Sequence, residues 1–190
     1  MRRFGFVLVV LCAGLGLIAP IAGCASSPPE AHGYQLDVPT GWKPMEHKDV
    51  VVPGRPLQAW SISGGGSMVI FRQIKGPITA QQLLTLTLNQ CANQPGWTID
   101  EHEVRKIDGL EAMWITVTGW GDGGSLAPTP TGEDPSDAGD ESLVRTRRLW
   151  LAVLRSDNVL SIQLHCRADQ HAEIRPAVDR MIASLRWGGA

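Results

Sequence analysis

Apolar and polar residues alternate along most of the chain with the two-residue period of a half-buried β-strand. In the first such segment, 34–38, apolar Tyr34, Leu36 and Val38 alternate with polar residues, and a Pro39-Thr40-Gly41 turn ends the segment. Further alternating or continuously apolar segments predict strands at 57–63, 67–74, 97–107, 110–120, 149–154 and 160–166.

Short turns join these predicted strands. Gly64-Gly65-Gly66 predicts a hairpin, and Asp108-Gly109 predicts a tight two-residue turn. The segment 110–120 is apolar on both of its faces, and 149–154 is apolar at every position. Strands that are buried on both faces need cover on both sides of their sheet.

The period changes to that of an amphipathic helix after the third strand. Thr79, followed three residues later by Gln82, predicts a capping-box start, and Pro95-Gly96 predicts the end. Cys91 belongs to the apolar stripe of this helix and is therefore expected to point inward. The stripe consists of Ala80, Leu84, Leu88 and Cys91.

A second helix is predicted at the end of the chain, with Pro176 in its first turn. Trp187 lies just past its expected end. The helical stripe consists of Ile174, Val178, Met181, Ile182 and Leu185.

The N-terminus has the order of a secretory signal, with Arg2 and Arg3 before an apolar run over 4–19. That run is shorter than the ~20 residues of a bilayer span. Ile21-Ala22-Gly23-Cys24 resembles the lipobox of bacterial lipoproteins, which implies cleavage before Cys24 and a diacylglyceryl group on its sulfur. The alternatives are an ordinary cleaved signal and an uncleaved anchor.

We therefore expect a signal peptide over 1–23, a tether over 24–33 and a single domain over 34–187. The chain would be lipid-anchored in the cell envelope, outside the cytoplasm. Ala25 follows the cysteine, and in a source with two membranes the familiar sorting rule would favour the outer membrane.

Removal of 1–23 lowers the basic residues from 17 to 15, against 19 acidic residues, so the mature net charge is −4. An acidic domain has no electrostatic reason to bind nucleic acid. The segment 121–142 is rich in Gly, Pro, Thr and acidic residues, and it predicts a disordered insertion between two strands.

Two cysteines remain after signal removal and lipidation. Cys91 lies on a helical stripe, and Cys166 lies on the apolar face of the last strand. An oxidising compartment would allow a disulfide between them. The alternative is two small buried side chains, because bonding demands a short Cα separation that sequence does not supply.

Two segments resemble the PsbP-like family. They are Tyr34-x-Leu36-x-Val38-Pro39-x-Gly41-Trp42 at the front and Met181-Ile182-Ala183-Ser184-Leu185 at the back. The resemblance covers roughly 33–187 and implies an α+β fold, an antiparallel sheet covered by helices on both faces (an α/β/α sandwich). The acidic insertion departs from the family pattern. No catalytic motif is common to the family, so the resemblance carries over no site residue.

The sequence carries no nucleophile motif of the Gly-x-Ser-x-Gly, Ser-x-x-Lys or Cys-x-x-Cys kind. His165, Cys166, Asp169 and His171 are clustered, but His165 and Cys166 would point to opposite faces of a strand. We therefore interpret the histidines as ordinary surface residues and expect neither a metal nor a cofactor.

Two further groups of residues have alternative interpretations. The seven tryptophans either fill the helix–sheet interfaces, which we favour, or line a ligand pocket. The second group is a cluster of four arginines, which forms either a surface that binds an anion or a partner, or a solvated edge of the sheet. Its members are Arg145, Arg147, Arg148 and Arg155.

These features favour an envelope lipoprotein that is not an enzyme and acts as a binding or scaffold module. Its expected partners are the membrane, through the lipid on Cys24, and a protein of the envelope. The alternative is a carrier of a small apolar ligand in a tryptophan-lined cavity. A third hypothesis is an enzyme whose residues meet only in three dimensions.

Overall fold

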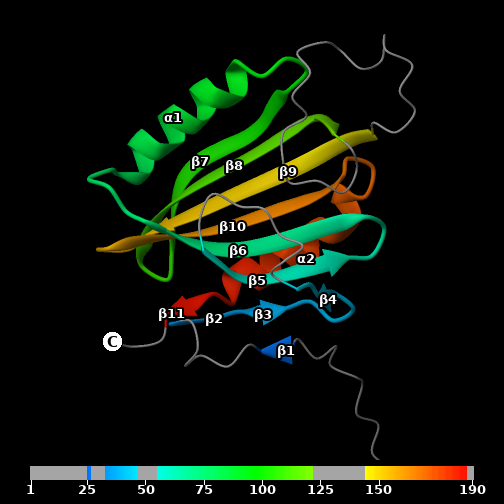
Figure 1. Ribbon diagram of the computed structural model, residues 1–190, viewed down its shortest axis with the longest axis horizontal. Coiled ribbons are helices and arrows are strands. Elements are labelled where there is room, and N and C mark those ends of the chain that lie inside the picture. The colour runs from blue at the N-terminus through cyan, green and yellow to red at the C-terminus, as the bar shows by residue number, and fades with distance from the viewer. Residues whose placement is uncertain (1–24, 27–32, 47–54, 122–143, 188–190) are drawn as a thin grey trace, which may run out of the picture.

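The computed structural model describes residues 25–26, 33–46, 55–121 and 144–187. Its main element is a seven-stranded antiparallel sheet with the order β4-β5-β6-β10-β9-β8-β7 (Figure 1). The strands of this sheet are β4 (Lys43–Pro44), β5 (Arg55–Ile62), β6 (Gly66–Ile74), β7 (Thr98–Ile107), β8 (Leu110–Gly121), β9 (Val144–Leu154) and β10 (Asn158–Arg167).

Two helices and two small sheets complete the described structure. The helices are α1 (Ala80–Ala92) and α2 (His171–Ala183). β1 (Ala25–Ser26) pairs with β3 (Asp37–Val38), and β2 (Tyr34–Gln35) pairs with β11 (Arg186–Trp187). No helix among the described residues is long and apolar enough to cross a membrane.

The connection through α1 determines the strand order. The chain leaves β6 in the middle of the sheet, passes through α1 and enters β7 at the far edge. It then returns strand by strand through β8 and β9 until β10 pairs with β6. β10 is therefore a central strand, with a neighbour on each side.

The predicted turn at Asp108-Gly109 is confirmed. Both residues have positive φ, 47° and 82°, as a two-residue type I′ hairpin requires. The Asp108 carboxylate also accepts the backbone N–H of Trp187 at 3.0 Å. The turn between β7 and β8 thus holds the end of the described chain.

The predicted start of α1 is confirmed as a capping box. The Thr79 hydroxyl accepts the Gln82 backbone N–H at 3.2 Å, and the Thr79 N–H donates to the Gln82 side-chain oxygen at 2.9 Å. Two backbone N–H groups that the first turn leaves without helical partners are satisfied in this way.

The predicted start of α2 is wrong. The helix begins at His171, so Pro176 lies inside it and not in its first turn. The Gln170 carbonyl already accepts the N–H groups of Glu173 and Ile174. Pro176 has no N–H to offer the carbonyl of Ala172, but Ala172 is exposed to water, which limits the cost.

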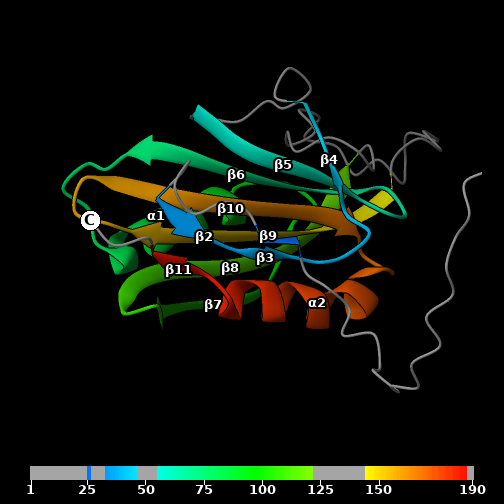
Figure 2. The same cartoon turned by 90° about the horizontal axis from the view of Figure 1, so that it is seen from below.

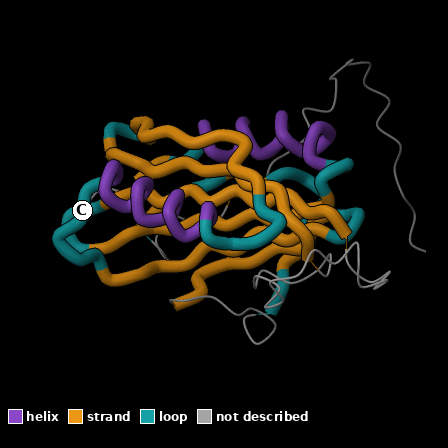
Figure 3. The backbone as a smooth tube through the Cα atoms, turned by 90° about the horizontal axis from the view of Figure 1, so that it is seen from above, coloured by secondary structure: helices purple, strands orange, loops and turns teal. Residues whose placement is uncertain are grey.

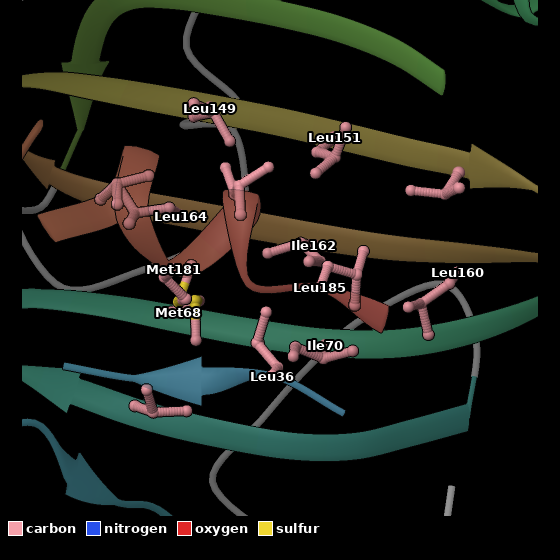
Figure 4. Close-up of a cluster of buried hydrophobic side chains, with 14 of the residues drawn as sticks. Leu36, Met68, Ile70, Leu149, Leu151, Leu160, Ile162, Leu164, Met181 and Leu185 are labelled. Atoms are coloured by element: carbon pink, nitrogen blue, oxygen red, sulfur yellow. The ribbon is translucent and has the colours of Figure 1, made fainter. Parts of the chain in front are cut away.

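Most buried apolar side chains form two clusters, and each cluster takes alternate residues of the strands. The α2-side core contains Ala112 and Trp114 of β8 together with Val178 and Met181 of α2. Figure 4 shows its centre, with side chains of β6, β9 and β10 meeting those of α2. Its labelled members are Leu36, Met68, Ile70, Leu149, Leu151, Leu160, Ile162, Leu164, Met181 and Leu185.

The α1-side core contains the intervening strand residues. Met113, Ile115 and Val117 of β8 pack there with Leu84 and Cys91 of α1. Successive residues of a strand point to opposite sides of its sheet, so the two helices contact different sets of strand side chains. Figure 2 shows α2 below β5, β6, β9 and β10, and Figure 3 shows the two helices as separate coils. The predicted α+β class, a mostly antiparallel sheet with two helices, is confirmed.

Candidate functional site

A cavity of about 260 Å³ lies beside α1, over strands β6, β8, β9 and β10. Its wall mixes apolar with uncharged polar side chains. The lining residues are Phe71, Gln73, Leu83, Thr87, Gln90, Met113, Trp150, Leu151, Ser161 and Gln163.

The helical wall of the cavity is one face of α1. Leu83, Thr87 and Gln90 are spaced by four and three residues, which places them one above another on the helix. The Thr87 hydroxyl donates to the Leu83 carbonyl at 2.8 Å and also contacts the Met113 sulfur at 3.4 Å. These contacts fix the Thr87 side chain between the helix and the sheet.

The floor of the cavity is set by strand register. Ser161 of β10 lies opposite Phe71 of β6, and Gln163 lies opposite Trp150 of β9. The Ser161 hydroxyl donates to the Gln73 side-chain oxygen at 3.3 Å. Directly opposite side chains are neighbours on one sheet face, so each of the two aromatic rings lies beside an uncharged polar group on the floor.

The lining contains no Asp, Glu, Lys, Arg, His or Cys. A charged ligand would therefore lose its hydration without finding a counter-charge there. Ser161 and Thr87 have no base in this lining to activate them, and nucleophilic catalysis requires one within hydrogen-bond reach. The arrangement suits the binding of an uncharged group.

A buried polar row crosses the same sheet face next to the cavity. His165 lies opposite Ser67 of β6 and opposite Arg148 of β9. The Arg148 guanidinium carbon lies 4.8 Å from the centre of the Trp97 ring, which is 6.0 Å from the Trp150 ring. The Trp97 and Trp150 rings therefore connect this polar row to the cavity, because Trp150 is one of the lining residues.

The prediction of surface histidines is wrong for two residues. His165 is fully buried, and His171 is buried at the start of α2, whereas His102 is exposed. Burial lowers the pKa of His171, and the positive charges of Arg147 and Arg175 lower it further. His165 and Cys166 do point to opposite faces, as predicted from strand geometry. Within the described ranges, no three or more His, Cys, Asp or Glu side chains are grouped to hold a metal ion.

The two predicted cysteines lie in different cores. Cys91 is in the α1-side core and Cys166 in the α2-side core, and both are free and buried. Burial raises the pKa of both thiols, that of Cys166 to about 12. In this structure they are thus two small buried side chains and not a disulfide.

The four clustered arginines do not form one surface. Arg147 pairs with Asp100 at 3.4 Å and with Glu101 at 3.8 Å, while Arg148 points to the opposite face. Arg155 stacks over the Trp187 ring at 5.0 Å, and Arg145 is exposed. Strand alternation and separate partners distribute these charges over the molecule.

Arg147 belongs to a charged network between β7 and α2. Arg175 donates to Glu101 at 3.1 Å and to Asp179 at 2.8 Å. Burial opposes ionisation of Glu101, but the hydrogen bond and charge of Arg175 and the charge of Arg147 hold its pKa below the usual value. The three acids outnumber and pair with the two arginines, so the network is a structural link and offers no anion site.

The tryptophans mainly fill the cores. Trp60 and Trp114 are buried in the α2-side core, and four others pack partly buried against one core or the other. Of the described tryptophans, Trp150 alone lines the cavity, so the predicted tryptophan-lined pocket does not describe it. The four partly buried members are Trp42, Trp97, Trp150 and Trp187.

Other sequence predictions lie outside the described residues. They include the lipidation site Cys24 and nearly all of the acidic insertion, since Gly121 ends β8 and the description resumes at Val144. Two residues of the expected tether, Ala25 and Ser26, form β1.

Comparisons with known proteins give a fold. No protein-family model matches the sequence, and no curated protein is similar to it in sequence. Among solved structures, the chain is similar to the cyanobacterial PsbP protein CyanoP of Synechocystis sp. PCC 6803, with a TM-score of 0.56 and 11% identity over 92% of this chain and 98% of that chain.

Two further solved structures are similar. LpqN of Mycobacterium tuberculosis, described as involved in cell envelope biogenesis, has a TM-score of 0.55 and 12% identity over 87% of this chain and 90% of that one. The Ran-binding protein Mog1p of Saccharomyces cerevisiae has a TM-score of 0.53 and 10% identity over 87% and 96%. Identities this low show a likeness of fold alone, and the fold of the chain is therefore PsbP-like.

Proposed function

We propose that this chain is a lipid-anchored, non-enzymatic binding module of the cell envelope, in which one helix covers each face of the sheet. The observation that carries the proposal is the cavity beside α1, whose wall offers aromatic and amide groups but neither acid nor base. The lipobox-like Ile21-Ala22-Gly23-Cys24 segment supports the anchoring. The envelope role described for LpqN and the Ran-binding of Mog1p are compatible with a binding role.

The size of the cavity favours docking of a partner over carriage of a ligand. Pockets for drug-sized ligands usually enclose about 300–1,000 Å³, and this cavity encloses about 260 Å³. That volume suits an uncharged side chain of a partner protein. A purely apolar cargo would bury the partly buried amide of Gln163 without a hydrogen bond, at a cost of about 1–3 kcal/mol. The carrier function therefore ranks second.

Photocrosslinking in native membranes tests the cavity. A photoreactive amino acid replaces Gln90 at the cavity, and in a matched chain it replaces exposed Glu173 on α2. An adduct with a protein other than a second copy of the chain is expected from position 90 and not from position 173. Thr87→Trp, which fills the cavity, should abolish the adduct, whereas Thr98→Trp on the exposed part of β7 should not. Equal adducts at both positions, or an adduct that survives Thr87→Trp, would contradict docking in the cavity.

Fractionation tests the anchor separately. The unmodified chain should sediment with membranes and take up labelled fatty acid, and Cys24→Ser should do neither. Retention of acyl label by Cys24→Ser would refute lipidation at that residue without bearing on the cavity.

A further inference from the structure

The outward face of α1 carries no charge. Residues 76–99, which include the whole helix, contain no Asp, Glu, Lys or Arg. The exposed positions of α1 are instead Gln, Thr, Asn, Ala and Leu. α2 differs, because its exposed positions include Glu173, Asp179 and Arg180. Solvated helix faces usually carry charges, and depletion of charge is typical of the centre of a protein interface.

An apolar side chain, Leu86, is exposed on the same face of α1. Among the residues that the structure describes, the exposed large hydrophobic side chains are Leu86, at 59%, and Ile74, at 95%, just before the uncharged segment. A hollow of about 490 Å³ adjoins Leu86 on the outer side of α1. It is lined by Pro77, Ile78, Gln81, Gln82, Thr85 and Leu86. Exposed apolar groups within a neutral polar surround mark interaction sites.

We propose that this face binds a second copy of the chain, through antiparallel packing of α1 on α1 about a twofold axis near Leu86. Leu86 is the middle residue of the helix, so twofold symmetry brings the Leu86 side chains of both copies together. Gln82, Leu86, Asn89 and Asn93 are exposed at spacings of four, three and four, the seam of paired helices. Gln82 of each copy then lies beside Asn89 of the other, and the Gln82 side-chain NH2 group, whose partner oxygen already accepts the Thr79 N–H, can donate to the Asn89 side-chain oxygen.

Charge selects a second copy over other occupants. The mature chain has a net charge of −4, so two copies repel one another wherever their acidic surfaces meet. The neutral face allows contact without that repulsion. A helix that lies in a membrane interface is normally rich in Lys and Arg, and α1 has neither. A basic partner would find no acidic side chain on α1.

The helix length bounds the strength of the dimer. α1 has 13 residues and is therefore about 20 Å long, so one helix pair gives an interface below the usual 1,200–2,000 Å². Such a contact is weak in solution but becomes populated when tethering raises the effective concentration. The dimer thus rests on the lipid anchor of the proposed function and is independent of the cavity.

Crosslinking of the lipidated full-length chain tests the contact. Leu86→Cys and, as the control, Glu173→Cys are purified from membranes, reconstituted in phosphatidylethanolamine–phosphatidylglycerol vesicles and treated with a short bis-maleimide. Position 86 should give covalent dimers at least about tenfold faster than position 173, because symmetry places the two Leu86 side chains together. Equal rates would overturn the proposal. So would an adduct of Leu86→Cys in native membranes with another protein alone, or quenching of a dye at position 86 by brominated lipid.

A pair of variants with opposite charges at position 86 distinguishes loss of the contact from misfolding. Fluorophores for energy transfer are attached at Glu173→Cys. Leu86→Glu or Leu86→Lys alone should lower vesicle-dependent energy transfer between copies, and a mixture of the two should restore it. Failure of the mixture to restore it would refute the twofold contact. Sedimentation with the vesicles reports the anchor, and the adduct from position 90 reports the cavity, so failure of either is recognised independently.

Discussion

Ionisation of the Cys166 thiol should destabilise the protein at alkaline pH. Cys166 lies in the α2-side core, where burial raises its pKa from 9.0 to about 12. Between these two values the unfolded chain releases a proton that the folded chain retains. Stability therefore falls as the pH rises above 9. The difference is about 1.4 kcal/mol at pH 10 and is negligible at pH 8.

Denaturant unfolding at pH 8 and pH 10 measures this loss, and Cys166→Ala is the control. The substitution itself should cost about 1 kcal/mol at pH 8, where titration of the thiol contributes almost nothing. The two chains share every other titrating group, including Tyr34, whose pKa burial also raises. The wild-type chain should therefore lose about 1.4 kcal/mol more than Cys166→Ala between the two pH values.

Equal losses in the two chains would refute the reasoning, and a thiol count would identify the cause. A chain with Cys12 and Cys24 replaced by Ser, denatured without reductant, should expose two reactive thiols from Cys91 and Cys166. A count of zero would establish that both are oxidised, and peptide mapping would then test the pairing.

Three further predictions concern stability and are checked by denaturant unfolding. Gly119→Ala should lower the free energy of unfolding by about 1–3 kcal/mol, because a Cβ there would lie 2.5 Å from the Trp97 ring. Its control is Gly76→Ala, which has open space around it and should change stability by less than about 0.5 kcal/mol. Thr79→Ala should cost about 0.5–2 kcal/mol through loss of the α1 capping box, with exposed Thr98→Ala as its control, and equal effects would contradict the capping role. Ile162→Ala should cost about 2–5 kcal/mol, because Ile162 is fully buried in the middle of β10, and a loss below 1 kcal/mol would contradict that placement.

Local patterns were sufficient to predict many of the elements. The capping box at Thr79 and the turn at Asp108 depend on neighbours within a few residues, and both are found as expected. The two-faced character of β8 was also readable, because Met113 and Trp114 must point to opposite sides of a strand. The sequence pattern misplaces the start of α2, because proline favours the first turn of a helix, whereas Pro176 lies inside α2 and the residue four before it, Ala172, is exposed.

The candidate site could not be predicted because it depends on strand order. Ser161, Gln163 and His165 are the polar half of an alternation, a pattern typical of a strand with one solvated face. Since β10 lies between β6 and β9, these side chains instead lie on a sheet face that also carries α1, beside the cavity or buried next to it. The available signal was indirect: a face that must be covered can still contain polar residues where the cover is incomplete.

Sheet width explains why the cavity lies where it does. Seven strands about 4.8 Å apart span about 29 Å, whereas one helix is about 10 Å wide and covers roughly two strands. α1 packs with residues of β8 and β9 and with the partly buried Ile99 and Val104 of β7. These three strands form one edge of the seven-stranded sheet. The strands beyond it on the same face carry the small cluster of Ala59, Val69 and Phe71. The cavity lies at the boundary between these two parts of the face. The position of the cavity therefore follows from a single helix that is too narrow for its sheet, and a partner that fills the cavity would extend the cover that α1 begins.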